Sequence, residues 1–579
     1  MNDRRDMWWQ NAVIYQIYPR SFQDSNGDGV GDLPGIRRRL PYLVELGVDA
    51  LWLSPIFPSP MADFGYDISD HTAIDERFGT LADFDAMLAE AHRLGLRVVL
   101  DYVPNHTSDR HPWFLASRSS RSDPRRDWYI WRDPAPGGGP PNNWRSVFGG
   151  SAWTRERTTG QYYYHAYLRE QPDLNWRHPD VQRAMLDVLR FWLDRGVDGF
   201  RVDALRQLVE DEALRDNPPN PDHHPGQGPY HALLPAYTAD QPETLEMVAL
   251  MRAVVDRYPD RLLIGELYLP IERLMAYYGV GVHLPANFHL ISVDWRAPRI
   301  AELIAAYEAA LPAGAWPNWV LGNHDKQRVA SRVGPAQARV AAMLLLTLRG
   351  TPTIYYGDEI GMADVAIAAE DVQDPWERNV PGLGLGRDPE RTPMQWDAGR
   401  HAGFTTGRPW LPLSAEAGLV NVAHQREDPA SMLALHRRLL VLRRARPALS
   451  VGDFEPVGVD GDVLAYVRSA EGDRCFVALN LGATPHTLAV PAGFRDARVL
   501  ISSHPDREGR PLGGRVMLAE NEGIVGGLAE ARGAGRAGAW LASRATSLGQ
   551  RSSPGQAMSA PADRPSDEIC RRLAAHGWC

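Results

Sequence analysis

Three acidic residues, Asp203, Glu266 and Asp325, each close a short apolar run of this sequence. Such runs are typical of buried parallel strands, and the carboxyl ends of barrel strands meet at one mouth. Carboxylates gathered there repel one another, so their convergence indicates a reaction that needs several of them. Cleavage of a glycosidic bond is such a reaction, because one carboxylate attacks the anomeric carbon while one carboxylic acid protonates the leaving oxygen.

An arginine favours different roles for two of these acids. Arg201 precedes Asp203 by two residues and therefore lies on the same face of its strand. We expect its positive charge to keep Asp203 ionised as the nucleophile, and the Asp203 anion to keep the proton on Glu266, the general acid. The alternative is a set of unrelated surface or ion-pair residues. It is weakened because each acid follows an otherwise apolar run.

Eight apolar runs alternate with amphipathic stretches over the first two thirds of the chain. In the stretch 81–96, for example, Phe84, Met87, Leu88 and Ala91 recur at helical spacing. Apolar strands followed by helices predict an α/β fold with a covered parallel sheet, and eight of them fit a closed (β/α)8 TIM barrel. The predicted strands are 12–19, 49–56, 97–105, 198–204, 262–267, 287–293, 318–325 and 351–359.

Two long insertions interrupt this alternation. Residues 107–176, rich in Pro, Gly, Trp and Arg, follow the third strand and are predicted to form an inserted subdomain. A Pro-rich loop at 206–245 follows the fourth strand. Both leave the end of the barrel at which barrel enzymes build their sites. The barrel itself is expected to comprise residues 1–106 and 177–449.

A separate β-domain is predicted at residues 450–528, after a helix-like stretch at 430–447. Residues 529–579 are rich in Ala, Gly, Ser, Arg and Pro, and we expect a largely disordered tail there. The strand-like runs that predict the antiparallel C-terminal domain are 462–469, 475–481 and 497–503.

Composition narrows the class of protein. The formal net charge of −10, from 72 acidic and 62 basic residues, speaks against a nucleic-acid partner. No apolar stretch is long enough for a membrane span, and the polar first ten residues lead into no signal-peptide core. The only three cysteines are Cys475, Cys570 and Cys579, which favours a cytoplasmic location over a disulfide framework.

Several motifs resemble those of a known enzyme family. The segments DYVPNH (101–106), GFRVDAL (199–205), GELY (265–268) and LGNHDK (321–326) are similar to the four conserved regions of the α-amylase family, glycoside hydrolase family 13. The resemblance runs in order over roughly residues 8–525. QPDLN and RTPMQWD resemble the α-glucosidase and oligo-1,6-glucosidase branch. Other similar segments are AVIYQIYPRSF, GYDI and GTPTIYYGDEIGM.

The resemblance implies a role for each matching residue. Asp203 would form a β-glucosyl-enzyme intermediate, Glu266 would act as acid and then base, and Asp325 would hold the 2- and 3-hydroxyls. Phe148, Tyr167 and Phe288 match positions that line the sugar site, although core packing explains them equally well. The other implied contacts are hydrogen bonds from His106 and His324, stacking by Tyr66, a clamp of Asp63 with Arg391 on the 4- and 6-hydroxyls, and Arg201 beside the nucleophile.

A loop after the first strand carries the oxygen donors of a divalent-cation site. The segment DSNGDGVGD (24–32) matches the start of an EF-hand, but Gly35 replaces the bidentate Glu at the twelfth position, which excludes one. The alternative is an Asp/Gly turn without metal, and we expect catalysis to need no cofactor. The resemblance implies a structural Ca2+ or Mg2+ bound by Asp24, Asn26, Asp28, Asp32 and the carbonyl oxygen of Val30.

The expected function is a retaining α-glucosidase that releases glucose from the non-reducing end of short α-glucosides, acting as a monomer or homodimer on small oligosaccharides. Ala204 is small where family members that prefer α-1,6 links tend to carry Val, which favours α-1,4 links. The loop at 206–245 is expected to wall off the acceptor side. The alternatives are an oligo-1,6-glucosidase, a glucosyl transferase or isomerase with the same scaffold, and a non-catalytic binding subunit.

Overall fold

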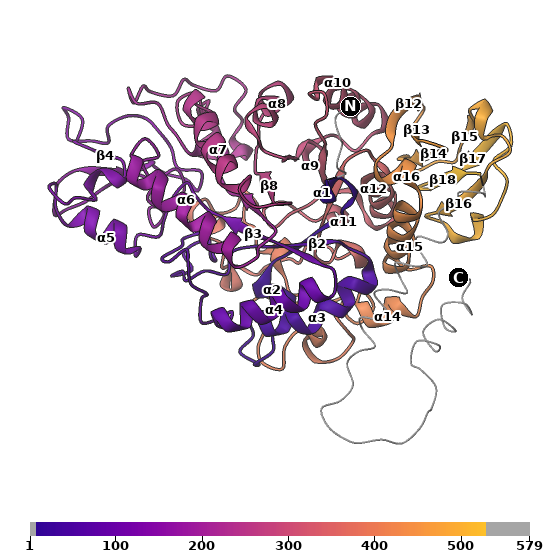
Figure 1. Cartoon of the computed structure of the whole chain (residues 1–579), viewed down its shortest axis with the longest axis horizontal. Coiled ribbons are helices and arrows are strands. Elements are labelled where there is room, and N and C mark those ends of the chain that lie inside the picture. The colour runs from indigo at the N-terminus through magenta and orange to yellow at the C-terminus, as the bar shows by residue number, and fades with distance from the viewer. Residues whose placement is uncertain (1–6, 529–579) are drawn as a thin grey trace, which may run out of the picture.

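The computed structural model describes residues 7–528, and its centre is a closed barrel of eight parallel strands in the order β1-β11-β10-β9-β8-β7-β3-β2 (Figure 1). The predicted (β/α)8 architecture is therefore confirmed. The strands are short and almost wholly buried, because helices cover the outside while packed side chains fill the inside. They are β1 (Ile14–Ile17), β2 (Ala50–Leu53), β3 (Arg97–Tyr102), β7 (Gly199–Val202), β8 (Leu262–Gly265), β9 (Leu284–Asn287), β10 (Asn318–Val320) and β11 (Thr351–Tyr355).

The sixth barrel strand differs from its prediction. It was expected at 287–293, but β9 ends at Asn287, and the helix α9 (His289–Ser292) occupies the predicted segment. The buried Asn287 side chain accepts a hydrogen bond from the backbone N–H of His289 at 3.1 Å, which starts this turn. A short apolar run fits a strand or a buried helix equally well, so its period did not distinguish them.

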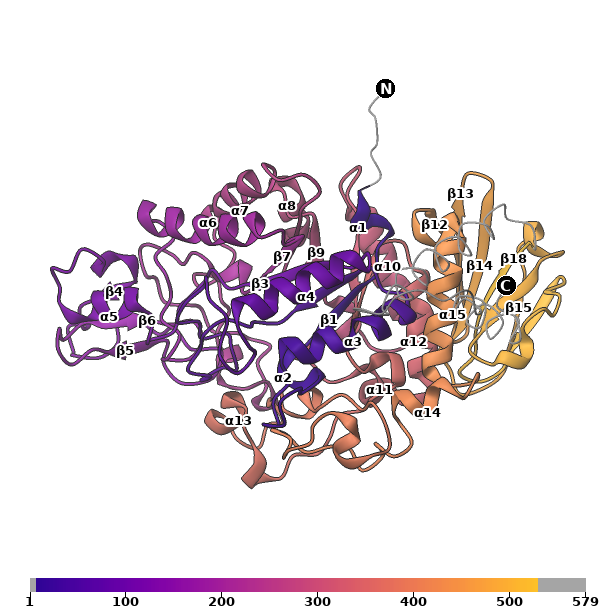
Figure 2. The ribbon, with the colours of Figure 1, turned by 60° about the horizontal axis from the view of Figure 1, so that its bottom comes forward.

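The amphipathic stretches form helices that surround the barrel (Figure 2). In α4 the Thr80 side chain and Asp83 form a capping box, and Phe84, Met87 and Leu88 face the core. Across residues 7–528, none of the helices is long and apolar enough to cross a membrane. The barrel helices are α1 (Trp8–Asn11), α2 (Pro19–Phe22), α3 (Leu33–Leu46), α4 (Leu81–Arg93), α6 (Pro179–Asp194), α7 (Pro242–Val255), α8 (Ile271–Val280), α10 (Ala297–Ala310), α11 (Val329–Val333), α12 (Pro335–Thr347), α13 (Pro375–Asn379) and α14 (Val422–Arg426).

The insertion after β3 contains the helix α5 (Pro112–Ser119) and a small antiparallel sheet in the order β4-β6-β5. Trp144 stacks on Trp153 there, with ring centroids 5.9 Å apart, and gives the insertion an aromatic core of its own. An isolated β-bridge between His106 and Asp173 holds the end of the insertion against its start, at the barrel mouth. The strands are β4 (Trp131–Arg132), β5 (Trp153–Arg155) and β6 (Tyr162–Tyr164).

The C-terminal domain is an antiparallel sheet in the order β12-β13-β14-β18-β16, with a second pair β15-β17. It packs on α10, α12 and α16 (Pro447–Ser450), which follows α15 (Met432–Ala445), and both views place it at the end of the molecule opposite the insertion (Figure 1, Figure 2). The expected tail at 529–579 lies outside the described residues. The strands are β12 (Asp453–Asp460), β13 (Val463–Ala470), β14 (Asp473–Asn480), β15 (His486–Ala489), β16 (Arg498–Ser502), β17 (Arg515–Leu518) and β18 (Gly523–Gly527).

Candidate active site

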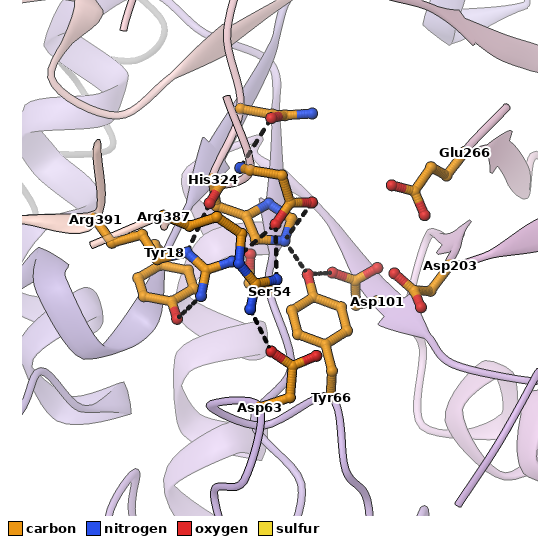
Figure 3. A network of polar contacts seen from close by, with 12 residues as sticks. Tyr18, Ser54, Asp63, Tyr66, Asp101, Asp203, Glu266, His324, Arg387 and Arg391 are labelled. Atoms are coloured by element: carbon orange, nitrogen blue, oxygen red, sulfur yellow. Dashed lines mark hydrogen bonds and ion pairs between the residues drawn. The ribbon is translucent and has the colours of Figure 1, made fainter. Parts of the chain in front are cut away.

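Arg201, near the end of β7, holds three carboxylates at the barrel mouth. Its Nη1 donates to Asp101 Oδ1 at 2.8 Å and to Asp203 Oδ1 at 2.6 Å, and its Nη2 lies 2.9 Å from Glu266 Oε1. The guanidinium is 1% exposed, so these ion pairs are shielded from water. The strand ends thus bring Asp203 and Glu266 to one cation, although they are 63 positions apart in the sequence. Figure 3 shows these two carboxylates near Asp101.

The electrostatics of Asp203 differ from the expectation that Arg201 alone would favour its anion. Burial and then the negative charge of Glu266 raise the pKa of Asp203 well above its ordinary value, and the opposing effect of Arg201 is insufficient. The reason is that the single guanidinium of Arg201 forms ion pairs with three acids at once. Burial likewise raises the pKa of Asp101 to about 6. The unliganded acid pair therefore binds a proton readily.

Glu266 is oriented by the backbone next to the nucleophile. Ala204 adopts a left-handed conformation, with φ of 49°, and its N–H donates to Glu266 Oε2 at 2.8 Å. A non-glycine residue in this region is uncommon and is tolerated best when its side chain is small. The strand-to-loop turn after Asp203 therefore aims the second carboxylate.

Asp325 lies in the loop beyond β10 and meets two arginines. Its Oδ1 accepts from Arg391 Nη2 at 2.8 Å and from Arg387 Nη1 at 3.3 Å. Burial alone would raise the pKa of Asp325, but the neighbouring guanidinium groups of Arg387 and Arg391 lower it well below its usual range. Asp325 therefore remains an anion, suited to accept hydrogen bonds from hydroxyl groups.

The arginine that pairs with Asp63 is Arg387, whereas the sequence motif pointed to Arg391. Arg387 Nη2 donates to Asp63 Oδ1 at 2.6 Å, and Arg387 lines the small cavity between these acids. Arg391 is fully buried behind Asp325, where its Nε donates to the carbonyl oxygen of His324 at 2.6 Å. The expected Asp63–Arg391 clamp is corrected accordingly: Arg391 positions Asp325 and the His324 backbone.

Two aromatic rings form the other side of this cavity. Tyr66 and His324 are stacked with centroids 5.2 Å apart, and the Tyr66 hydroxyl donates to Asp101 Oδ2 at 2.8 Å. Gln16 Nε2 donates to His324 Nδ1 at 2.8 Å, which leaves the His324 proton on Nε2, facing the Tyr66 oxygen at 2.6 Å. Burial lowers the pKa of His324 well below its usual value and that of His106 to about 3, so both rings are neutral hydrogen-bonding groups.

The glucosyl pocket, our name for this small cavity of about 60 Å3, adjoins a larger one of about 360 Å3, the outer chamber. Phe148 and Tyr167 line both cavities. Phe288 is not among the lining residues; it packs under Tyr268, with centroids 4.4 Å apart, and Tyr268 faces the outer chamber. The glucosyl pocket is lined by Asp63, Tyr66, His106, Phe148, Tyr167, Asp203, Glu266, His324, Asp325 and Arg387.

The loop at 206–245 supplies one wall of the outer chamber, and sequence reasoning named none of the residues that it contributes. Its short helical turns, Leu205–Gln207, Pro225–Gln227 and Pro229–Ala232, bring Arg206, Tyr230 and His231 to the chamber. Lys326, Trp376 and Tyr268 complete it from other loops. Only GELY and LGNHDK, which contain Tyr268 and Lys326, offered a signal for these positions.

The loop at 24–32 is held together by its own hydrogen bonds. Asp24 accepts from the backbone N–H groups of Asn26, Gly27 and Gly29, while Asp28 accepts from Val30. Asp32 caps α3 through Gly35 and also binds Ser25, so its oxygens are directed away from a shared ligand position. Within residues 7–528, no group of three or more His, Cys, Asp or Glu side chains is arranged to hold a metal ion.

Comparison with known proteins agrees with this geometry. The α-amylase family model, described as the α-amylase catalytic domain, matches residues 16–452. The chain is 46% identical over 502 residues to a probable α-glucosidase of Rhizobium meliloti (strain 1021), covering 84% of this chain and 91% of that protein. It is 37% identical over 549 residues to an oligo-1,6-glucosidase of Parageobacillus thermoglucosidasius, covering 87% and 96%.

Among solved structures, the α-glucosyl transfer enzyme XgtA is similar with a TM-score of 0.85 and 43% sequence identity, covering 90% of this chain and 99% of that one. The family match spans the barrel strands that carry Arg201, Asp203 and Glu266. Both the sequence relatives and the barrel architecture therefore lead to one assignment. The chain belongs to the α-amylase family of glycoside hydrolases.

Proposed function

We propose that this enzyme is a retaining, exo-acting α-glucosidase that releases α-glucose from the non-reducing end of short α-glucosides. The observation that carries the proposal is the contact of Asp203 and Glu266 with one guanidinium beside a small cavity that both acids line. Retention requires the two carboxyl groups to be about 5–5.5 Å apart, so that both reach one anomeric centre. A shared cation is compatible with that spacing.

The reaction follows from these positions. Asp203 attacks the anomeric carbon and forms a glucosyl ester, while the proton of Glu266 passes to the departing glycosidic oxygen. Glu266 then removes a proton from water, the hydroxide adds to the anomeric carbon, and Asp203 departs as a carboxylate. The two inversions leave the product in the α configuration, and no cofactor enters either step. Asp325, held ionised by Arg387 and Arg391, accepts hydrogen bonds from the ring hydroxyls.

The Asp63–Arg387 pair supports cleavage from the chain end. Both side chains are at least 94% buried, and they are bonded to each other in the lining of the glucosyl pocket. A further glucose unit there would have to displace this ion pair, so only a terminal glucose with free 4- and 6-hydroxyls fits. The small side chain of Ala204 beside Glu266 favours α-1,4 over α-1,6 links in this proposal.

Product analysis tests the proposal directly. Maltose, isomaltose, sucrose, trehalose and soluble starch are incubated with the enzyme, and the anomeric signals are followed by NMR. We expect α-glucose to appear first from maltose, with isomaltose slower and starch slowest. An initial β-glucose signal larger than the share supplied by the reducing-end unit of maltose, or faster release from starch than from maltose, would contradict the assignment. The Asp203→Asn variant, with its fold checked by circular dichroism, should lose activity by at least about 10,000-fold.

Two alternatives share this site and have tests of their own. The outer chamber of about 360 Å3 has room for an acceptor sugar, which favours transglucosylation at high substrate concentration. Longer or rearranged products from concentrated maltose would establish glucosyl transfer or isomerisation. A higher turnover of isomaltose than of maltose would establish an oligo-1,6-glucosidase.

A structural ion is a further part of the proposal. Asp24, Asn26, Asp28 and the Val30 carbonyl would bind Ca2+ or Mg2+ and tie the loop to the start of α3. Chelation by EDTA should then lower the midpoint of thermal unfolding, and added Ca2+ should restore it. An identical midpoint in the Asp24→Asn, Asp28→Asn variant with and without EDTA serves as the control. A wild-type midpoint insensitive to EDTA would exclude the ion.

The cellular location is a separate part of the proposal. Cys475 is buried, and burial raises the pKa of its thiol to about 12, so that it is an inert thiol of the kind a reducing cytoplasm preserves. We propose a cytoplasmic enzyme, present as a monomer or homodimer. Cell fractionation and light scattering after size-exclusion chromatography test the two statements separately.

A further inference from the structure

Two positively charged side chains of the outer chamber have no acidic partner within residues 7–528. Arg206 Nη1 donates to the carbonyl oxygen of Tyr268 at 2.8 Å, and Lys326 Nζ lies 5.5 Å from the centroid of the Tyr268 ring. The arginines of the glucosyl pocket differ, because Arg201 and Arg387 each bind two or more carboxylates. Arg206 and Lys326 therefore make no ion pair within the described residues, although Glu266 and Asp325 also line the outer chamber.

Lys326 is also the only lysine of the chain, among 62 lysine and arginine residues. Its ammonium is a compact charge on a flexible stem, whereas a guanidinium presents donors in a fixed plane. Arg206 and Lys326 together thus offer one oriented and one adjustable donor around Tyr268. Such a pair suits an anion whose position varies between ligands.

The remaining wall adds an unused polar group. Tyr230 lines the chamber, and its hydroxyl is shielded from solvent without a hydrogen-bond partner in the described chain. Burial, and then the charges of Arg206 and Lys326, lower the pKa of His231, which places both cations within electrostatic range of that one ring. A shielded hydroxyl near two free cations calls for a polar ligand, since an unpaired buried group is unfavourable.

We propose that the outer chamber selects α-glucosides whose leaving group carries a negative charge, bound by Arg206, Lys326 and the Tyr230 hydroxyl. This inference rests on the proposed α-glucosidase function and specifies its aglycone. The leaving oxygen still takes its proton from Glu266, while the acidic group stays ionised throughout. Neither cation lines the glucosyl pocket, whose own acids are paired with other arginines.

Maltobionate and maltitol form a matched pair of substrates for the test. Both carry glucose on an open-chain acceptor, and they differ in a carboxylate against a CH2OH group. We expect kcat/KM to be about tenfold higher for maltobionate at low ionic strength, and the advantage to shrink in about 0.5 M salt as the charges are screened. Equal or slower cleavage of maltobionate would overturn the inference. Failure to cleave maltose, maltitol and maltobionate alike would instead overturn the proposed function.

Variants of Arg206 and Lys326 test whether the preference for maltobionate arises in the outer chamber. In Arg206→Gln, Lys326→Gln the ratio of the two specificity constants should fall to near one, while Lys326→Arg should retain most of it. The control is Arg296→Gln, Arg495→Gln, which removes the same charge from two exposed positions without ion pairs to described residues. A ratio that falls equally in the control would show a general effect of net charge and would overturn the inference.

The unique lysine permits an independent measurement. In the Asp203→Asn background, which prevents turnover, an acetylating reagent should modify Lys326 as the only side-chain amine, detected by peptide mass spectrometry. Maltobionate should slow this acetylation more than maltitol does at equal concentration. Equal protection by the two ligands, or a Lys326 amine that the reagent does not reach, would contradict binding of the carboxylate there.

Discussion

The glucosyl pocket and the outer chamber share Glu266 and Asp325 but are built in opposite ways. In the glucosyl pocket, buried acids from strand ends and adjoining loops are each bonded to an arginine. In the outer chamber, Arg206, Lys326 and Trp376 come from separate segments outside the barrel strands and are partly exposed. The difference indicates that the barrel determines the reaction while its loops determine the leaving group.

This contrast also predicts unequal sensitivity to substitution. A buried charge that loses its partner destabilises the protein strongly, because its desolvation is no longer compensated. A partly exposed group without a partner is replaced at little cost to the fold. Loss of the shared cation of the glucosyl pocket should therefore have the largest effect, and loss of the aromatic wall of the outer chamber the smallest.

Replacement of Arg201 should have the largest effect. In Arg201→Gln three buried carboxylates lose their cation, so we expect roughly 3–5 kcal/mol of destabilisation near neutral pH and no measurable turnover of maltose. Urea unfolding and initial rates measure the two effects. The loss of stability should diminish at acidic pH, where the acids are protonated. A stable and active Arg201→Gln enzyme would contradict the role assigned to this guanidinium.

Replacement of Arg387 and of Arg391, which lie in one loop, should affect different quantities: kcat/KM for the first and the midpoint of thermal unfolding for the second. Arg387→Gln should lower kcat/KM for maltose about 100-fold, because the contact with Asp63 and the terminal hydroxyls is lost. An aryl 4-deoxy-α-glucoside, which lacks one of these hydroxyls, should be affected much less. Arg391→Gln should instead lower the thermal midpoint, since its partners are Asp325 and the His324 backbone. Equal losses of kcat/KM for maltose and for the aryl 4-deoxy-α-glucoside would contradict the assignment of Arg387 to these hydroxyls.

Valine in the turn after the nucleophile should slow the turnover of maltose. Ala204→Val places a β-branched side chain at φ of 49°, which is strained and displaces the N–H that orients Glu266. We expect kcat for maltose to fall about tenfold. Ala204→Gly, which adopts this conformation freely, is the matched control and should retain most of the activity. A similar loss in the two variants would exclude the backbone explanation.

The acidic limb of the pH profile should depend on Glu266. Burial and the charge of Glu266 raise the pKa of Asp203, and the nucleophile must be ionised, so kcat/KM should fall as pH decreases through that raised value. In Glu266→Gln the repulsion is absent and the limb should move to lower pH. A p-nitrophenyl α-glucoside is the suitable substrate because its phenolate leaves without a proton. A limb that stays in place would show that Glu266 does not act on Asp203.

The aromatic wall of the chamber should show the smallest effect. Trp376→Ala removes an aromatic face from the leaving-group side, so we expect KM for maltose to rise about three- to tenfold with kcat nearly unchanged. Glucose inhibition reports on the glucosyl pocket and should be the same as in the wild type. A weakened glucose inhibition would indicate that Trp376 supports both cavities.

Local patterns were sufficient for the barrel and for the acids. Apolar runs followed by helices predicted the eight strands, and residue type with position after a strand singled out Asp203, Glu266 and Asp325, because a parallel barrel sends every strand end to one mouth. The sixth strand was misplaced, since NFHLISV is apolar at too many positions for its period to distinguish strand from helix.

Tertiary structure alone decided which side chains face the sugar. Arg387 and Arg391 lie four residues apart in one irregular loop, and only the fold directs the first to Asp63 and the second to Asp325. Tyr268 likewise faces the chamber while Phe288 supports it from behind. Loops have no repeating geometry from which the direction of a side chain follows, so the chamber around Lys326 is defined by contacts between distant segments and not by any local pattern.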